Sequence, residues 1–216
     1  MLEVKELCVE IGKFFLKDIA LEVEDGECFV LLGPTGAGKT LLLESIAGLK
    51  SVSSGQVIIN GRDVTALNLE KRRIGFAYQD YALYRHLSVR DNISFGLMWR
   101  TKMRREIEHA VDQVVELLGL EALLKKGATA LSGGESQKIA LARAVAIKPD
   151  LLILDEPLSA IDPESKEAMG RELKELHNRL GVTTIHVTHD FEEAITLGHR
   201  IAVMMGGHII QIGTPD

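Results

Sequence analysis

The chain has 216 residues, 46% hydrophobic and 26% charged, a composition typical of a globular domain and unlike that of disordered or collagen-like chains. A formal net charge of −6 argues against broad electrostatic binding to nucleic acid. Apolar runs such as residues 28–32 are far shorter than the roughly 20 residues that cross a bilayer. The start, MLEVKELCVE, carries acidic side chains where a secretory signal has a basic end. We therefore expect one domain, located in the cytoplasm.

A strand followed by a helix opens the first recognisable α/β unit. The sequence ECFVLL is a nearly continuous apolar run and predicts a strand that is buried on both faces. Residues 39–49 then show the apolar spacing of a helix, with Leu42, Leu43, Ile46 and Leu49 on its buried side.

The loop between them, GPTGAGKT, is predicted to bind the phosphates of a nucleotide. It matches the pattern GxxxxGK[ST] between a strand and a helix, the context that this pattern requires. Its glycines let the backbone curl so that successive N–H groups point at phosphate oxygens. Lys39 would bring charge to the β- and γ-phosphates and Thr40 a hydroxyl to Mg²⁺. An ordinary glycine-rich turn would leave this lysine unexplained. The predicted binding residues are Gly33, Pro34, Thr35, Gly36, Ala37, Gly38, Lys39 and Thr40.

A helical region follows, because the strand pattern nearly disappears between about residues 80 and 149. Residues 104–118 place apolar side chains along one helix face, at Ile107, Val111, Val114, Val115 and Leu118. We predict a helical subdomain, about residues 80–149, inserted in the core of one domain that spans residues 1–216.

The sequence LSGGE, residues 131–135, begins an amphipathic helix. Ser132 and Glu135 have the spacing of a capping box, which is one interpretation of the motif. Gly133 and Gly134 would then lie in the first turn, each costing roughly 1 kcal/mol relative to alanine. Glycines that weaken a helix indicate a closely approaching ligand, and a phosphate at this helix N-terminus would explain them.

Two carboxylates end the next predicted strand. The sequence LLILDEP places Asp155 and Glu156 at the carboxyl end of a buried strand, where open α/β sheets bind ligands. Asp155 can hold Mg²⁺ directly or through water, and Glu156 can orient and deprotonate an attacking water. Without the phosphate loop, the pair would fit a strand end that enters a turn equally well.

Two further strands, TTIHVT and IAVMM, complete a predicted α/β sheet. Gly206 and Gly207 separate IAVMM from HIIQI. This spacing predicts a hairpin whose two turn residues both have positive φ.

Taken together, these motifs make the chain resemble the ATP-binding subunits of ABC transporters over nearly its whole length, from about Val4 to Gly213. Besides GPTGAGKT, LSGGE and LLILDEP, it has Gln79 after a strand, the loop SAID at residues 159–162 and His189 after another strand, in the family's order. The resemblance implies a P-loop NTPase with a RecA-like core, an N-terminal antiparallel β part and an inserted helical subdomain.

The resemblance also implies an ATPase site that two copies share. Subunits of this family pair head to tail when ATP binds, so the signature residues Ser132, Gly133 and Gly134 would act on the partner's nucleotide. Asp162 would carry signals across this interface, although it also suits the cap of a helix that begins with proline.

Gln79 and His189 complete the site that the resemblance implies. Gln79 would sense Mg²⁺ and the attacking water, and His189 would contact the γ-phosphate. In isolation, a strand-end amide and an ordinary hydrogen-bonded histidine would explain them better. The implied catalytic residues are Glu156, His189, Gln79 and Lys39, and the implied metal ligands are Thr40, Gln79 and Asp155.

Residues 79–97, QDYALYRHLSVRDNISFGL, resemble the segment of binding-protein-dependent importers that meets the membrane subunit, although a helix start with core Leu and Phe positions also fits. The resemblance therefore implies an importer ATPase on the inner face of the cell membrane. Its partners would be permease subunits and, indirectly, a solute-binding protein, with no nucleic acid. LLGPTGAGKT and YQDYAL are similar to sequences of molybdate, tungstate and sulfate uptake ATPases. The alternatives are an exporter ATPase or a soluble ABC ATPase that acts on ribosomes or DNA.

One departure concerns the adenine. The family commonly has a stacking aromatic before the phosphate loop, whereas the aligned position here holds Ile11, with Phe14 and Phe15 just downstream.

Overall fold

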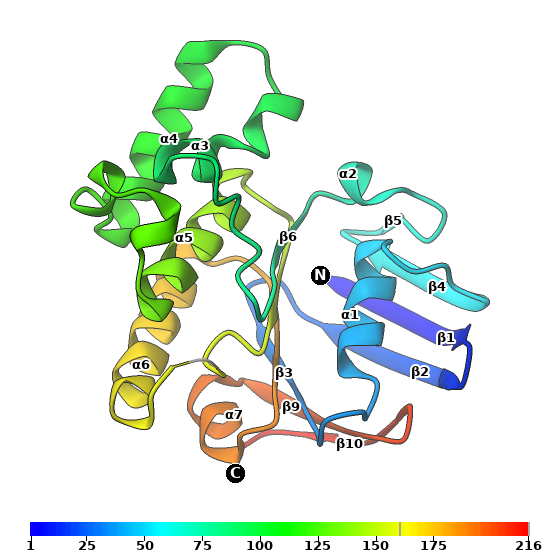
Figure 1. The fold of residues 1–216 in the computed structure, drawn as a ribbon. Coiled ribbons are helices and arrows are strands. Elements are labelled where there is room, and N and C mark those ends of the chain that lie inside the picture. Colours follow the sequence, from blue (N-terminus) through cyan, green and yellow to red (C-terminus); the bar gives the residue numbers. More distant parts are fainter. Residues whose placement is uncertain (160, 216) are drawn as a thin grey trace.

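The computed structural model describes residues 1–159 and 161–215; Ala160, in the SAID loop, and Asp216 lie outside the described residues. Two sheets and a group of helices make up the fold (Figure 1). The strands are β1 (Leu2–Ile11), β2 (Phe14–Val23), β3 (Cys28–Leu32), β4 (Ser54–Ile59), β5 (Arg62–Asp63), β6 (Ile74–Ala77), β7 (Leu151–Asp155), β8 (Thr184–Thr188), β9 (Arg200–Met205) and β10 (His208–Gly213). The α-helices are α1 (Lys39–Ala47), α2 (Leu69–Arg72), α3 (Val89–Ser94), α4 (Arg104–Leu118), α5 (Gly133–Ala146), α6 (Pro163–Leu180) and α7 (Phe191–Leu197), and the 3-10 helices are η1 (Leu97–Trp99), η2 (Leu123–Lys125) and η3 (Ala128–Ala130).

The larger sheet has six strands in the order β10-β9-β3-β8-β7-β6, all parallel except β10. Both of its faces are covered. Along β7, for example, Leu151 and Ile153 join one hydrophobic cluster, whereas Leu152 and Leu154 join another. Burial on both faces explains why the predicted strands appeared as continuous apolar runs rather than alternating ones.

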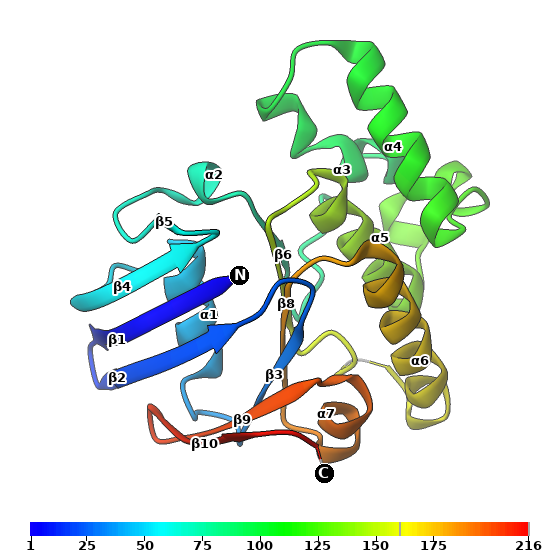
Figure 2. The same ribbon diagram turned by 180° about the vertical axis from the view of Figure 1, so that it is seen from behind.

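The smaller sheet is antiparallel, with the order β2-β1-β4-β5. Helix α1 lies between the two sheets, as Figure 2 shows from behind, and its buried residues Leu42, Leu43 and Ile46 share a cluster with side chains of both. The predicted combination of a P-loop α/β core and an N-terminal antiparallel part is confirmed.

Helices α3, α4 and α5 lie between β6 and β7 in the chain and pack together in the second cluster. The face predicted for residues 104–118 is turned inward, with Val111, Val114 and Val115 buried and Ile107 and Leu118 partly buried. None of the described helices is long and apolar enough to span a membrane.

Two local predictions can be compared directly with the backbone. Gly206 and Gly207 have φ of 54° and 79°, as predicted for the turn between β9 and β10. The predicted extent of the first helix was wrong, because α1 ends at Ala47 and Leu49 is 39% exposed. Gly48, with φ of 81°, takes the left-handed conformation that ends helices, and this turns Leu49 away from the buried face.

Candidate active site

The phosphate loop runs from the end of β3 into α1. Gly36 and Gly38 have φ of 84° and 102°, values that residues with side chains rarely adopt. A Cβ on Gly33 would lie 2.3 Å from the carbonyl oxygen of Met204, so only glycine fits there. No side chain caps the N-terminus of α1 in the described structure, which leaves its first N–H groups available to an anion. Both the backbone and the helix end therefore suit a bound phosphate.

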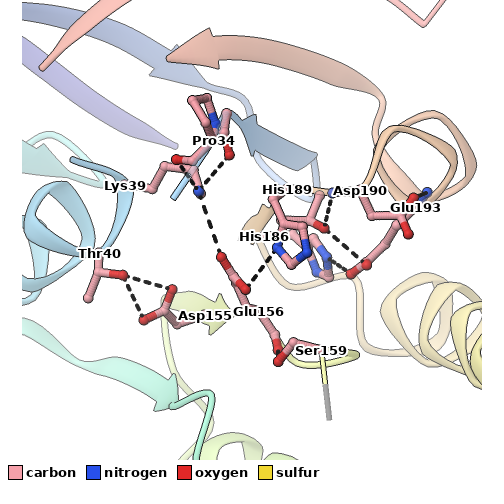
Figure 3. Close-up of polar contacts among 12 residues, drawn as sticks. Pro34, Lys39, Thr40, Asp155, Glu156, Ser159, His186, His189, Asp190 and Glu193 are labelled. Atoms are coloured by element: carbon pink, nitrogen blue, oxygen red, sulfur yellow. Dashed lines mark hydrogen bonds and ion pairs between the residues drawn. The ribbon is translucent and has the colours of Figure 1, made fainter. Parts of the chain in front are cut away.

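Lys39 is 5% exposed and turns back over the loop that precedes it. Its Nζ donates hydrogen bonds to the carbonyl oxygens of Gly33, at 2.7 Å, and Pro34, at 3.1 Å. The same ammonium lies 3.7 Å from Oε1 of Glu156 (Figure 3). Its positive charge is thus held on the inner side of the loop.

Asp155 and Thr40 form a pair of oxygen ligands beside the loop. The Thr40 hydroxyl lies 3.3 and 3.2 Å from the two carboxylate oxygens of Asp155. Asp155 is 4% exposed, and burial raises its pKa to about 6, against the hydrogen bond from Thr40, which lowers it. A buried carboxylate next to a hydroxyl is a pair of oxygen ligands that fits a hard divalent cation such as Mg²⁺.

Glu156 lies at the centre of the site. Oε2 of its carboxylate lies 3.0 Å from Nδ1 of His189, within hydrogen-bond distance, while Oε1 faces Lys39. Its φ of 45° is in the left-handed region, a strained conformation for a residue with a side chain. The backbone is held there because the N–H of Glu156 donates to the carbonyl oxygen of Val187 on the neighbouring strand. Strand pairing, rather than the backbone preference of the residue itself, therefore sets the conformation of Glu156.

The strand order explains why these groups meet. Strands β3, β8, β7 and β6 are adjacent and parallel, so the residues that follow each strand all lie at the carboxyl end of the sheet. The phosphate loop follows β3, His189 follows β8 and Asp155 ends β7. Gln79 follows β6; it is exposed, and its side chain makes no hydrogen bond within the described part of the chain.

The signature residues are located elsewhere. Ser132 and Glu135 form the predicted capping box at the start of α5, with hydrogen bonds of 3.3 and 2.9 Å. Among residues 1–159 and 161–215, no hydrogen bond or ion pair joins residues 132–134 to the phosphate loop or to Glu156. Asp162 directly precedes α6 and is exposed. One chain therefore does not bring Ser132, Gly133 and Gly134 to its own phosphate loop.

The turn between β9 and β10 is hydrogen-bonded to the phosphate loop. The N–H of Gly207 donates to the carbonyl of Ala37 at 3.0 Å, and the N–H of Lys17 donates to the carbonyl of Gly207 at 3.1 Å. Near this turn, the ring of Phe15 contacts His208, with 5.9 Å between ring centroids. Phe14, paired with Ile11 across the hairpin, is 65% exposed.

Sequence reasoning missed a charged cluster next to His189. It consists of Lys166 on α6, Asp190 just before α7 and Glu193 on α7. One feature of the sequence could have indicated it: Lys166 lies near the start of a helix, where a positive charge is disfavoured unless a specific acidic partner is present.

Comparison with known proteins supports this picture. A protein family described as ABC transporter matches residues 16–159. A molybdate/tungstate import ATP-binding protein of Pyrococcus abyssi is 46% identical over 213 residues, which cover 99% of this chain and 62% of that protein. A sulfate/thiosulfate import ATP-binding protein of Caulobacter vibrioides is 46% identical over 205 residues, which cover 93% of this chain and 60% of that protein. The chain thus spans less than two thirds of the length of these relatives.

A solved structure has the same fold. It is a dimeric ATP-binding cassette in a post-hydrolysis state, bound to ADP and Pi, and it superposes with a TM-score of 0.85 at 27% identity. The superposition covers 100% of this chain and 99% of that one.

Proposed function

Because the chain belongs to the ABC transporter family, we propose that it binds ATP and hydrolyses it to ADP and phosphate to power a membrane importer. The observation that carries this proposal is the convergence of Lys39, Glu156 and His189 beside the phosphate loop. At the carboxyl end of the sheet, a positive charge can bind phosphate, a carboxylate can activate water and an imidazole can stabilise developing charge, which are roles that phosphoryl transfer to water uses.

Each residue has a role in this proposal. The loop N–H groups and Lys39 hold the β- and γ-phosphates, and Glu156 orients the attacking water and accepts its proton. His189, 3.0 Å from Glu156, is in reach of the same water and stabilises charge that develops on the γ-phosphate. Thr40, Asp155 and Gln79 would hold Mg²⁺, which neutralises phosphate charge when it is bound.

A second copy of the chain would complete the site. Within one chain, α5 and its N-terminal signature lie apart from α1 in both ribbon views (Figures 1 and 2). The fold-matched cassette bound to ADP and Pi is a dimer. We infer an ATP-dependent, head-to-tail dimer in which Ser132, Gly133 and Gly134 of one copy contact the nucleotide of the other, with Asp162 at the interface. The helical region of about residues 80–149 would then be the subdomain that carries the signature.

A groove beside the helical region is the proposed permease contact. Its volume is about 490 Å³, and its apolar lining includes Phe76, Tyr84, Phe95 and Trp99. Trp99 is 82% exposed, which is unusual for a large aromatic side chain. Arg73 and Arg100 at the same groove favour an occupant that is apolar with acidic flanks, such as a short amphipathic helix of a membrane subunit.

The transported solute is proposed from the relatives alone. Proteins named for import of molybdate/tungstate and of sulfate/thiosulfate match nearly the whole chain at 46% identity. We propose an oxyanion of this class, delivered by a solute-binding protein to permease subunits, with this chain on the inner face of the membrane.

Hydrolysis is tested with the purified chain, ATP and Mg²⁺. Glu156→Gln should retain ATP binding and slow phosphate release by about a hundredfold or more, the low end of general-base effects. The matched control is Glu164→Gln, which alters an exposed carboxylate at the start of α6 and should leave turnover unchanged. Normal turnover in Glu156→Gln would contradict its assignment as the base.

Transport is tested in cells that lack this chain. Uptake of labelled molybdate, tungstate and sulfate should fall, and it should return with the wild-type chain but not with Glu156→Gln. If the purified chain hydrolyses ATP but cells that lack it take up all three ions normally, the oxyanion assignment would be excluded and the ATPase assignment would remain.

A further inference from the structure

The segment that carries His189 is held from both sides. Before it, the Thr188 hydroxyl donates to Oε2 of Glu193 at 3.0 Å. After it, the N–H of Asp190 donates to the Thr188 hydroxyl at 3.0 Å, and the Asp190 carboxylate caps α7 by accepting from the N–H groups of Glu192 and Glu193. The position of the imidazole therefore depends on where Asp190 and Glu193 lie.

One lysine connects these two carboxylates. Nζ of Lys166 lies 2.5 Å from Oδ2 of Asp190 and 3.5 Å from Oε2 of Glu193. Lys166 belongs to α6, whereas Asp190 caps α7 and Glu193 lies in its first turn, so the ammonium joins the two helices at the end of α7 nearest to His189. Figure 3 shows Asp190 and Glu193 beside His189 and Glu156.

The electrostatics of the cluster depend on this ammonium. The side chain of Glu193 is 5% exposed, and besides Lys166 it has Nε2 of the buried His186 at 2.6 Å. The hydrogen bond from Lys166 is the main reason why the pKa of Asp190 is lowered. Two carboxylates within reach of one Nζ repel each other when that charge is removed, and a buried carboxylate that loses its partner is costly.

Simple packing of α6 against α7 does not require Lys166. A second lysine on α6, Lys174, already reaches α7, where its Nζ donates to the carbonyl of Thr196 at 2.6 Å. The contact of Lys174 lies at the opposite end of α7 from His189. The two lysines therefore join the same pair of helices, but only Lys166 contacts the residues that hold the His189 segment.

We infer that Lys166 is a positioning residue for His189, which keeps the imidazole beside Glu156 through Asp190 and Glu193. This inference rests on the proposed ATP hydrolysis. Lys166 lies in the first turn of α6, where its N–H donates to the carbonyl of Asp162, the residue proposed to lie at the dimer interface.

The test compares Lys166→Met with Lys174→Met, measuring kcat and KM for ATP in the full chain. Lys166→Met should lower kcat about tenfold or more, since misplacing a catalytic group by about 1 Å can cost about a hundredfold. KM should change less than about twofold, because the phosphate loop is untouched. Lys174→Met should keep wild-type kcat, and Lys166→Arg, which preserves the charge, should restore most of it.

The outcomes separate the inference from the proposed function. A wild-type chain without ATPase activity would contradict both. If the wild type is active, two results would contradict the inference alone. One is a wild-type kcat in Lys166→Met, and the other is a loss of kcat in Lys174→Met as large as that in Lys166→Met. Lys166→Gln and thermal unfolding are measured in parallel, and loss of the folded state in both Lys166→Met and Lys166→Gln would show a structural role and overturn the positioning role.

Discussion

Two adjacent acidic residues carry a local energetic cost at the candidate site. Burial raises the pKa of Asp155 to about 6, and Glu156 holds a left-handed φ of 45°. Strained or under-compensated groups of this kind persist only where the surrounding structure imposes them, and they concentrate at functional sites. Both costs here fall on residues that the proposed mechanism uses.

Asp155→Asn should therefore stabilise the chain in the absence of divalent cations. The ordinary pKa of this carboxyl is 3.8, and the folded value is about 6. Because the pKa of Asp155 is higher in the folded state, its ionisation destabilises the fold. Its contribution to stability is fully present below a pH of about 3.8 and is lost as the pH rises through about 6. At pH 8 in EDTA, the variant should gain about 1 to 3 kcal/mol in the free energy of unfolding.

The measurement is urea unfolding of both proteins at pH 8 and pH 5. The gain should shrink at pH 5, where the wild-type carboxyl is partly protonated. Equal stability at pH 8 would show that Asp155 is better compensated than its burial indicates. Hydrolysis in Mg²⁺ should be lost at either pH.

Among the elements, the end of α1 depends on a residue from a different element. Arg72 on α2 is 3% exposed, and its guanidinium donates to four carbonyl oxygens, those of Ser45 and Ile46 at the end of α1 and those of Leu67 and Thr65. A Cβ on Gly48 would lie 2.5 Å from Nε of Arg72, so the glycine that ends α1 also makes room for this arginine.

Arg72→Lys should destabilise the fold by about 2 kcal/mol or more. A single ammonium cannot reproduce the planar fork of a guanidinium, so buried carbonyl groups lose their donors. Arg73→Lys is the matched control, because Arg73 is exposed and pairs with Asp150 at the surface. That change should cost less than about 1 kcal/mol. Chemical unfolding of both variants is the measurement, and equal losses would contradict the explanation.

For the whole molecule, the separation of the signature from the phosphate loop predicts association. Glu156→Gln should sediment as a monomer without nucleotide and as a dimer with ATP and Mg²⁺, since slow hydrolysis preserves the ATP that holds two copies together. Adding Ser132→Arg, which places a bulky charge at the start of α5, should prevent this dimer. A monomer in every condition would mean that the shared site needs the permease or is wrongly assigned.

The proposed permease groove makes a second prediction at this scale. Trp99→Ala should lower oxyanion uptake in cells at least severalfold while leaving the ATPase activity of the isolated chain unchanged, because Trp99 lines the groove and not the phosphate loop. Met103→Ala, which alters another exposed apolar residue nearby in the chain, is the control. Equal effects of both changes on uptake would argue against this groove.

Much of this architecture was predictable from the sequence, and the regularity of each element's apolar pattern explains where the prediction succeeded or failed. Strand β7 and helix α4 have the predicted bounds, because their apolar patterns are long and regular. The end of α1 was missed by two residues, because the spacing of leucines continues past Gly48 while the backbone does not. The charged cluster of Lys166, Asp190 and Glu193 has no such pattern.

Local motifs were sufficient to identify the reacting groups: a phosphate loop, two carboxylates at a strand end, a histidine after a strand and a capped helix carrying two glycines. Short motifs can specify these features because a few neighbouring residues set the chemistry and, in the phosphate loop and the capped helix, the local conformation as well. Which of these groups meet, and the left-handed backbone of Glu156, depend instead on the pairing of distant elements. The order β3-β8-β7 brings Lys39, His189 and Glu156 together, and the packing of α6 against α7 places Lys166 between Asp190 and Glu193. Contacts between residues far apart in the chain depend on how whole elements pack, and no local pattern encodes that.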